Sequence, residues 1–353
     1  MIELDGSFGE GGGAIIRNAL ALSALTRKPF KVGNIRKGRC KPGLMAQHLN
    51  AVLAVKEICN AKVEGAKLHS TQLVFYPKEI KAKTLSVDIG TAGSITLLLQ
   101  ALLLPCVFTN NKVRLRLKGG TDTKWSMPYD YFANVFLPHI RFLAEFDVKL
   151  LKRGYYPKGG GRIDIKIKPK HKISDFKSFD MFLDVLKEKN QRFDILEPGK
   201  IEGVEGISHA SNDLQKANVA ERQVKGAKQA LGKLDCNINI KKEYSDSLCP
   251  GSGICLWAVS DNNAIVGADA LGERGKRAEI VGKQAGESLL KELKANAPVD
   301  SHLADQLIPY LALLGGSYRT TKISKHTTTN IYVAEKFIDV KFGIDEDKKV
   351  VSV

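Results

Sequence analysis

The chain has 353 residues, of which 43% are hydrophobic and 26% charged, and it carries a net charge of +16 with an isoelectric point near 9.4. This length suits two domains, or one large domain with an insert. No apolar run approaches the roughly 20 residues of a membrane span, and no signal peptide is visible at the start. We therefore expect a soluble cytoplasmic protein without a membrane partner.

The net charge indicates a class of binding partner, and the cysteine spacing bears on a structural metal site. Lys and Arg outnumber Asp and Glu by 54 to 38, which favours a polyanion such as nucleic acid, although a lysine-rich solvated surface gives the same balance. The cysteines form no CxxC pair, so a structural zinc site is not expected. They are Cys40, Cys59, Cys106, Cys236, Cys249 and Cys255.

A weak internal repeat organises the chain. Residues 2–25 and 85–104 each read as a strand, a small-residue loop and an apolar helix. Each is followed by a basic strand, a second helix (44–61 and 128–146) and a strand pair, which makes a βαβαββ unit. A third unit closes the chain, with a helix over 301–314 and another that begins just after His326.

A segment of different character interrupts this repeat at 185–292. It opens on the charged stretch KEKNQR and continues with alternating strands and helices, including a hairpin turned by SDNNA. The sequence therefore predicts an α/β (α+β) fold. Residues 1–184 and 293–353 form a large domain of three βαβαββ units, and 185–292 form a small inserted α/β domain.

The glycine-rich stretch GSFGEGGGAIIR, residues 6–17, lies between a strand and a helix. Backbone N–H groups at Gly11, Gly12 and Gly13 can approach a phosphate closely, although a flexible turn has the same composition. Glu10 would repel a phosphate unless a divalent cation lies between them, which indicates Mg²⁺ or Mn²⁺. Arg17 could neutralise the same phosphate or be solvated.

The most basic loop is NIRKGRCKPG, residues 34–43. Arg36 and Arg39 suit bidentate contacts with phosphate, although such loops are also common as solvated surface. Gln47 and His48 follow in the next helix. His48 precedes an apolar residue by four positions, so we expect it to face the core.

The loop GGTDTKWSMPYDYF, residues 119–132, combines glycines with Trp125, Pro128 and Tyr131. A flat nucleobase can stack on proline or on an aromatic ring, so a base-binding slot is one interpretation and core aromatics are the other.

His326 lies in a loop between Lys325 and Thr327, close to a helix start. Neighbouring cations favour the neutral imidazole, the form that can act as a nucleophile or a base. Asp305 lies off the apolar stripe of the preceding helix, where it could orient His326 or cap the helix. A capping-loop histidine without catalytic function is the alternative.

These pieces together resemble the RNA 3'-terminal phosphate cyclase family. The resemblance rests on seven blocks in the same order over essentially the whole chain. They are LDGSFGEGGGAIIRNALALSAL, NIRKGRCKPGLMAQHLNAV, GTAGSITLLLQ, GGTD, RGYYPKGGG, ADQL and HTTTNIYVAEKF.

The resemblance implies that ATP and a divalent metal convert an RNA 3'-phosphate into a 2',3'-cyclic phosphate through histidine–AMP and RNA–adenylate intermediates. It implies that His326 carries AMP, that Asp305 orients it and that Glu10 holds the metal. Further implied contacts fall into two groups. The residues that would bind phosphates of ATP or RNA are Arg17, Arg36, Arg39 and Gln47. The residues that would otherwise contact ATP are Gly11, Gly12, Gly13, Gln100, Pro128, Tyr131 and His302.

Two positions depart from the family pattern: Ala14 replaces a glutamine and His302 replaces a tyrosine found in some members. Both bear on nucleotide preference and neither changes the nucleophile. A non-catalytic RNA-binding factor of ribosome biogenesis is the main alternative. An enolpyruvyl transferase, with six βαβαββ units and no insert, fits less well. The sequence leaves a homo-oligomer open.

Overall fold

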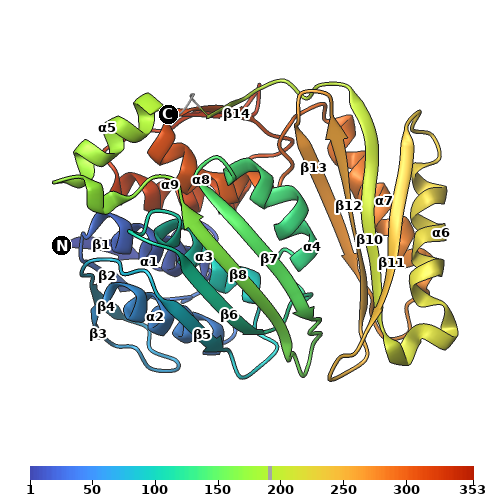
Figure 1. The fold of residues 1–353 in the computed structure, drawn as a ribbon, viewed down its shortest axis with the longest axis horizontal. Helices are drawn as coiled ribbons and strands as arrows, with labels where there is room; N and C mark the ends of the chain where they lie inside the picture. The colour runs from blue at the N-terminus through green and yellow to red at the C-terminus, as the bar shows by residue number, and fades with distance from the viewer. Residues whose placement is uncertain (190–192) are drawn as a thin grey trace.

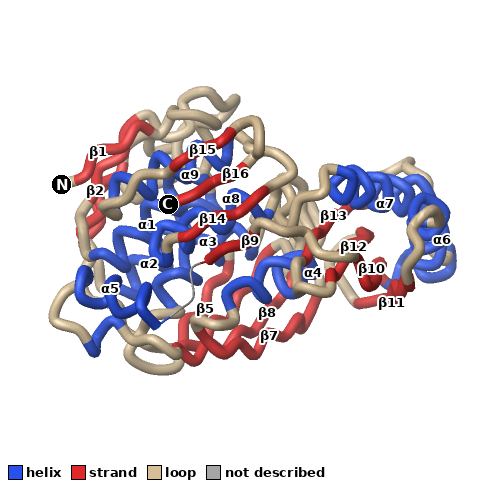
Figure 2. Tube along the Cα trace, turned by 90° about the horizontal axis from the view of Figure 1, so that it is seen from above, coloured by secondary structure: helices blue, strands red, loops and turns tan. Residues whose placement is uncertain are grey.

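The computed structural model describes residues 1–189 and 193–353 as a mixed α/β protein with two lobes (Figures 1 and 2). Residues 190–192, part of the charged stretch expected to open the insert, lie outside this description. Within the described residues, no helix is both long and apolar enough to cross a bilayer.

The first sheet and its helices come from the N-terminal part of the chain. Its elements are β1 (Ile2–Asp5), α1 (Ala14–Thr26), β2 (Phe30–Gly33), α2 (Ala46–Cys59), β3 (Lys62–Glu64) and β4 (Leu73–Tyr76). The strand order is β1-β2-β4-β3, with β1 and β2 parallel. Helix α1 is buried along its whole length because it packs against α3 and α9 as well as α2.

The second sheet has the same order of pairing, β5-β6-β8-β7. Its elements are β5 (Thr84–Asp88), α3 (Ile95–Cys106), β6 (Val113–Gly119), α4 (Tyr129–Tyr131), β7 (Ala144–Lys152) and β8 (Gly161–Pro169). The helix expected over 128–146 was wrong beyond its first half. After α4 the chain passes through a π-helix and a 3-10 turn ending at Ile140, and Ala144 already begins β7. Pro138 contributes to this because it lacks the N–H that a regular helix needs.

The third sheet has the order β15-β16-β14-β9. Its elements are α5 (Phe179–Lys189), which precedes the sheet, then β9 (Phe193–Ile195), α8 (Leu303–Leu314), β14 (Gly316–Arg319), α9 (Lys325–Phe337), β15 (Gly343–Asp345) and β16 (Val350–Ser352). Strand β9, which the sequence analysis assigned to the insert, pairs in parallel with β14 and so belongs to this sheet.

The remaining segment forms the second lobe. Its elements are β10 (Ile201–Ser211), α6 (Val219–Leu231), β11 (Asn237–Ser245), β12 (Ser252–Ser260), β13 (Ile265–Leu271) and α7 (Ala278–Lys294). Figure 2 shows α6 and α7 covering one face of the sheet. A separate apolar core lies between the sheet and these two helices. On the opposite face of the sheet, Cys255 of β12 packs into the core of the large lobe.

A buried ionic cluster joins the two lobes. Arg153 of the large lobe lies 3.0 Å from Asp130 and 3.4 Å from Asp122, and its other terminal nitrogen donates to Glu243 of the second lobe at 2.8 Å. His209 of the second lobe places Nε2 3.3 Å from Asp122. The guanidinium thus compensates two carboxylates that water cannot reach, and the imidazole lies beside one of them.

Candidate active site

His326 lies in the first turn of α9, with its side chain 48% exposed. The Oγ of Ser324 accepts hydrogen bonds from the N–H groups of His326 and Thr327, both at 3.1 Å. This capping box begins the helix at Lys325, so the prediction that the helix starts after the histidine was wrong. The cap holds the backbone of His326 while its imidazole remains open to solvent.

Glu10 faces His326 from the loop between β1 and α1. Its N–H donates to Oγ1 of Thr329 at 3.0 Å, and that hydroxyl donates to the carbonyl of Lys325 at 2.6 Å. Its carboxylate forms an ion pair with Arg39 and lies 4.0 Å from Nδ1 of His326. The glycine loop is therefore attached to the turn that carries the histidine.

Backbone conformation and close neighbours favour glycine at three positions of this loop. Gly11 has a φ of +61°, a conformation that side chains disfavour. A β-carbon at Gly12 would collide with the carboxylate of Glu10, and one at Gly13 would collide with the ring of His48 and the guanidinium of Arg17. Larger residues at these positions would displace the groups that face the loop.

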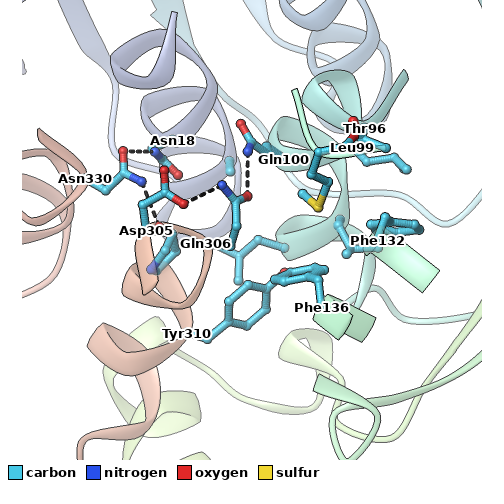
Figure 3. Close-up of a pocket in the computed structure, with 15 residues that line it drawn as sticks. Asn18, Thr96, Leu99, Gln100, Phe132, Phe136, Asp305, Gln306, Tyr310 and Asn330 are labelled. Atoms are coloured by element: carbon cyan, nitrogen blue, oxygen red, sulfur yellow. Dashed lines mark hydrogen bonds between the residues drawn. The ribbon is translucent and has the colours of Figure 1, made fainter. Parts of the chain in front are cut away.

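Arg17 lies beneath the loop, only 8% exposed. Its Nε donates to Oε1 of Gln100 at 2.5 Å, Gln100 donates to Gln306 at 2.5 Å, and Gln306 donates to Oδ1 of Asp305 at 2.8 Å. Figure 3 shows this network, apart from Arg17, at the wall of a small cavity between α1, α3 and α8. Desolvation lowers the pKa of Arg17 to about 10, so it stays charged at neutral pH.

The electrostatic setting of His326 favours its neutral form. Desolvation, followed by the charges of Arg17, Arg39 and His302, lowers the pKa of His326 below its ordinary value. Desolvation raises the pKa of Asp305 to about 6. Among the described residues Asp305 and His326 share no hydrogen bond, so the expected direct orientation of His326 by Asp305 is not seen.

The two arginines of the basic loop differ in availability. Arg36 has a φ of +54°, and its Nη1 donates to the carbonyls of Lys41 at 2.7 Å and Gly43 at 3.0 Å, so part of its guanidinium holds its own loop. Arg39 instead reaches Glu10 across an open recess of about 580 Å³. The recess is lined by Ser7, Gly9, Glu10, Gly11, Lys37, Gly38, Arg39 and Lys325.

Gln47 and His48 lie in the first turn of α2. Within the described parts of the chain Gln47 makes no hydrogen bond through its side chain, so its amide is available to a ligand. The prediction that His48 faces the core is confirmed, since it is 4% exposed and its Nδ1 accepts from the N–H of Met45 at 3.2 Å. Desolvation lowers its pKa to about 3.

The expected adenosine contacts lie at different depths. Pro128 is buried at the start of α4, and Tyr131 is 1% exposed and donates from its hydroxyl to Asp300 at 2.6 Å. His302 is exposed and meets Tyr131 edge to face, with ring centroids 6.5 Å apart. Tyr131 therefore supports His302 from below and does not offer its hydroxyl to a ligand.

Asp300 is a residue that the sequence analysis missed. It is fully buried, and its Oδ1 also accepts from the N–H groups of His302 and Leu303, both at 2.9 Å. It therefore caps α8 and fixes His302. An aspartate just ahead of an apolar helix is a capping signal that could have identified it.

The structure is thus a mixed α/β protein in which His326 lies beside Glu10 and is influenced by the charges of Arg17 and Arg39. The family model for RNA 3'-terminal phosphate cyclase matches residues 8–344. The RNA 3'-terminal phosphate cyclase of Pyrococcus abyssi is 47% identical over 98% of this chain and 95% of its own length. Those of Pyrococcus furiosus (46%; 99% and 98%) and Methanococcoides burtonii (44%; 100% and 99%) are similar throughout as well. The chain belongs to the RNA 3'-terminal phosphate cyclase family.

Proposed function

We propose that this protein uses ATP to convert an RNA 3'-terminal phosphate into a 2',3'-cyclic phosphate, with His326 as the residue that carries AMP. The observation that carries this proposal is the position of His326, half exposed at a capped helix start and 4.0 Å from Glu10, which lines the basic recess. A neutral imidazole with cations on either side can attack a polyphosphate that those cations attract.

In the first step a ring nitrogen of His326 would attack the α-phosphorus of ATP. A P–N bond forms, a P–O bond breaks and pyrophosphate leaves. Arg17 and Arg39, whose charges act on the imidazole, would stabilise the negative charge on the phosphates. Lowering of the histidine pKa keeps the attacking lone pair free of a proton at neutral pH.

In the later steps AMP would pass from His326 to the RNA 3'-phosphate. The neighbouring 2'-hydroxyl then attacks the 3'-phosphorus and displaces AMP. The hydroxyl and the phosphate belong to one ribose, so proximity assists closure of the ring. Lys37 and Lys325, which line the same recess as Arg39, would contact the RNA phosphates.

Glu10 would hold Mg²⁺ or Mn²⁺. Mg²⁺ commonly binds through one or two carboxylates together with substrate phosphates and waters, and a single carboxylate facing the recess fits that donor set. The metal would supply charge neutralisation beside the phosphates. Arg39, now paired with this carboxylate, would be free to contact a phosphate once the metal is bound.

The test uses an RNA oligonucleotide with a radiolabelled 3'-phosphate, ATP and Mg²⁺ or Mn²⁺. Cyclisation should make the labelled phosphate resistant to phosphatase. Treatment of the product with an enzyme that opens the cyclic phosphate should make the label sensitive to phosphatase again. His326→Ala should abolish the resistance, and His302→Ala should leave it measurable. RNA that stays phosphatase-sensitive with well-folded wild-type protein would contradict the proposal and favour a non-catalytic RNA-binding role.

A further inference from the structure

Trp125 is the most exposed large apolar side chain in the described parts of the chain, at 95%. It lies between β6 and α4, three residues before Pro128. Its φ of +62° is a conformation that bulky residues rarely adopt. Strained residues of this kind persist where the surrounding structure fixes them, and they cluster at ligand sites.

The turn that presents Trp125 is fixed from both sides. Ser126 donates from Oγ to the carbonyl of Thr123 at 2.9 Å, and the two hydroxyls lie 3.0 Å apart. The next carbonyl, that of Met127, accepts from Oγ1 of Thr96 on α3 at 2.6 Å. These hydrogen bonds fix the turn that carries the exposed indole.

The indole borders a groove of about 650 Å³ between the large lobe and the second lobe. The lining residues come from the Trp125 turn, the end of β13 and α7. They are Lys124, Trp125, Asp269, Ala270, Leu271, Glu273, Lys276, Gln284, Glu287, Ser288 and Lys291. The groove lies close to His302, because Gly267, two residues before Asp269 on β13, donates from its N–H to Asp300 at 2.9 Å, and Asp300 accepts from the N–H of His302.

The charges in the groove are largely compensated. Glu273 pairs with Lys124 at 3.3 Å and with Lys276 at 3.8 Å, and Glu287 pairs with Lys283 at 3.6 Å. Lys291, by contrast, makes no ion pair or hydrogen bond with any described residue. The groove thus offers an aromatic face, uncharged polar groups, the cation of Lys291 and the carboxylate of Asp269, neither of which pairs with a described residue.

We propose that Trp125 and the facing side of α7 bind a nucleobase of single-stranded RNA upstream of the 3'-end held at His326. This inference rests on the proposed function. An uncharged flat base suits the indole and the compensated walls, and Lys291 suits the phosphate attached to it. Stacking on an aromatic face tolerates any base, as an enzyme that acts on an RNA end requires. The second lobe thereby supplies one wall of the RNA site.

The first test uses intrinsic fluorescence and binding. The chain has two tryptophans, Trp125 and Trp257, so Trp125→Leu leaves one reporter. A 3'-phosphorylated oligonucleotide should quench the wild-type emission and should not quench the Trp125→Leu emission. Trp125→Leu should weaken RNA binding about tenfold, whereas Trp125→Phe, which keeps an aromatic face, should weaken it far less.

The second test needs no variant that could misfold. A series of oligonucleotides carries one abasic nucleotide at successive positions. Wild-type protein should bind the oligonucleotide that is abasic at one upstream position about tenfold more weakly than the others. The affinity of Trp125→Leu should not fall at that position. Equal loss in both proteins, or quenching by ATP alone, would overturn the inference. Labelling of His326 by ATP without RNA, measured in parallel, reports on the proposed function separately, since Trp125→Leu should retain it.

Discussion

The Nε of Arg17 donates a hydrogen bond to Oε1 of Gln100 over 2.5 Å, and both residues lie on helices that meet beneath the glycine loop. Gln100 in turn donates a hydrogen bond to Gln306 on α8, so one side chain connects α1, α3 and α8. Because Arg17 is buried, its orientation depends on this acceptor.

Gln100→Met should lower the free energy of unfolding by about 1–3 kcal/mol, because a buried donor of Arg17 loses its acceptor. Gln100→Glu keeps an acceptor and adds an opposite charge, so its stability should lie closer to that of wild type. Urea denaturation of the three proteins measures the difference. A methionine variant as stable as wild type would show that Arg17 finds another partner.

Arg153→Met should destabilise the protein by about 3–5 kcal/mol, because the buried Asp122 and Asp130 would lose the guanidinium that pairs with both. The matched control is Arg114→Met, which removes a partly exposed ion pair with Asp164 and should cost far less. Both are measured by chemical denaturation. Similar losses in the two variants would argue against a special role for the cluster between the lobes.

Ser324→Ala should destabilise α9 by about 0.5–2 kcal/mol, because two N–H groups lose their acceptor. One of them belongs to His326, so transfer of AMP to the protein should also slow. Ser324→Thr keeps the hydroxyl and should restore most of both properties. Thermal denaturation and single-turnover labelling separate the two effects; an alanine variant with normal labelling would show that the cap does not position the imidazole.

His48 should make stability depend on pH. Its pKa is about 3 in the folded protein and close to 6.5 in the unfolded chain, so between these values only the unfolded chain takes up the proton. The contribution of His48 is therefore complete above pH 6.5 and falls by about 1.4 kcal/mol for each unit below it.

The comparison that isolates this effect is His48→Gln, which cannot titrate. The difference in unfolding free energy between wild type and variant should shrink by about 2–3 kcal/mol from pH 6.5 to pH 4.5. Urea denaturation at each pH gives the values. A difference that stays constant with pH would mean that His48 is protonated in the folded state.

The sequence predicted regular elements well where one periodic pattern decided the structure. The apolar stretch over 301–314, expected to be a helix, forms α8 from Leu303 to Leu314. The stretch over 128–146 carries an equally apolar pattern, but Pro138 and the pairing of β7 with β8 end the helical conformation early. Strand β9 was missed because three residues are too few for an alternating pattern, and its pairing with β14 depends on residues more than a hundred positions away.

The arrangement of side chains in the candidate active site could be predicted less well from local sequence patterns. Glu10 and His326 lie at opposite ends of the chain, and neither local sequence indicates that their side chains face each other. The resemblance to a known family supplied that pairing. The positions of Asp300 beneath His302 and of Asp305 within an amide network depend on side-chain packing, which spacing along the chain does not encode.

The central claim is that His326 becomes covalently linked to AMP, and the most direct measurement is labelling with α-³²P-ATP and Mg²⁺ or Mn²⁺ followed by denaturing electrophoresis. We expect an acid-labile, hydroxylamine-sensitive label on wild type, lost in His326→Ala and retained in His48→Gln. A label that persists in His326→Ala, or no label with any metal on folded wild-type protein, would contradict the account.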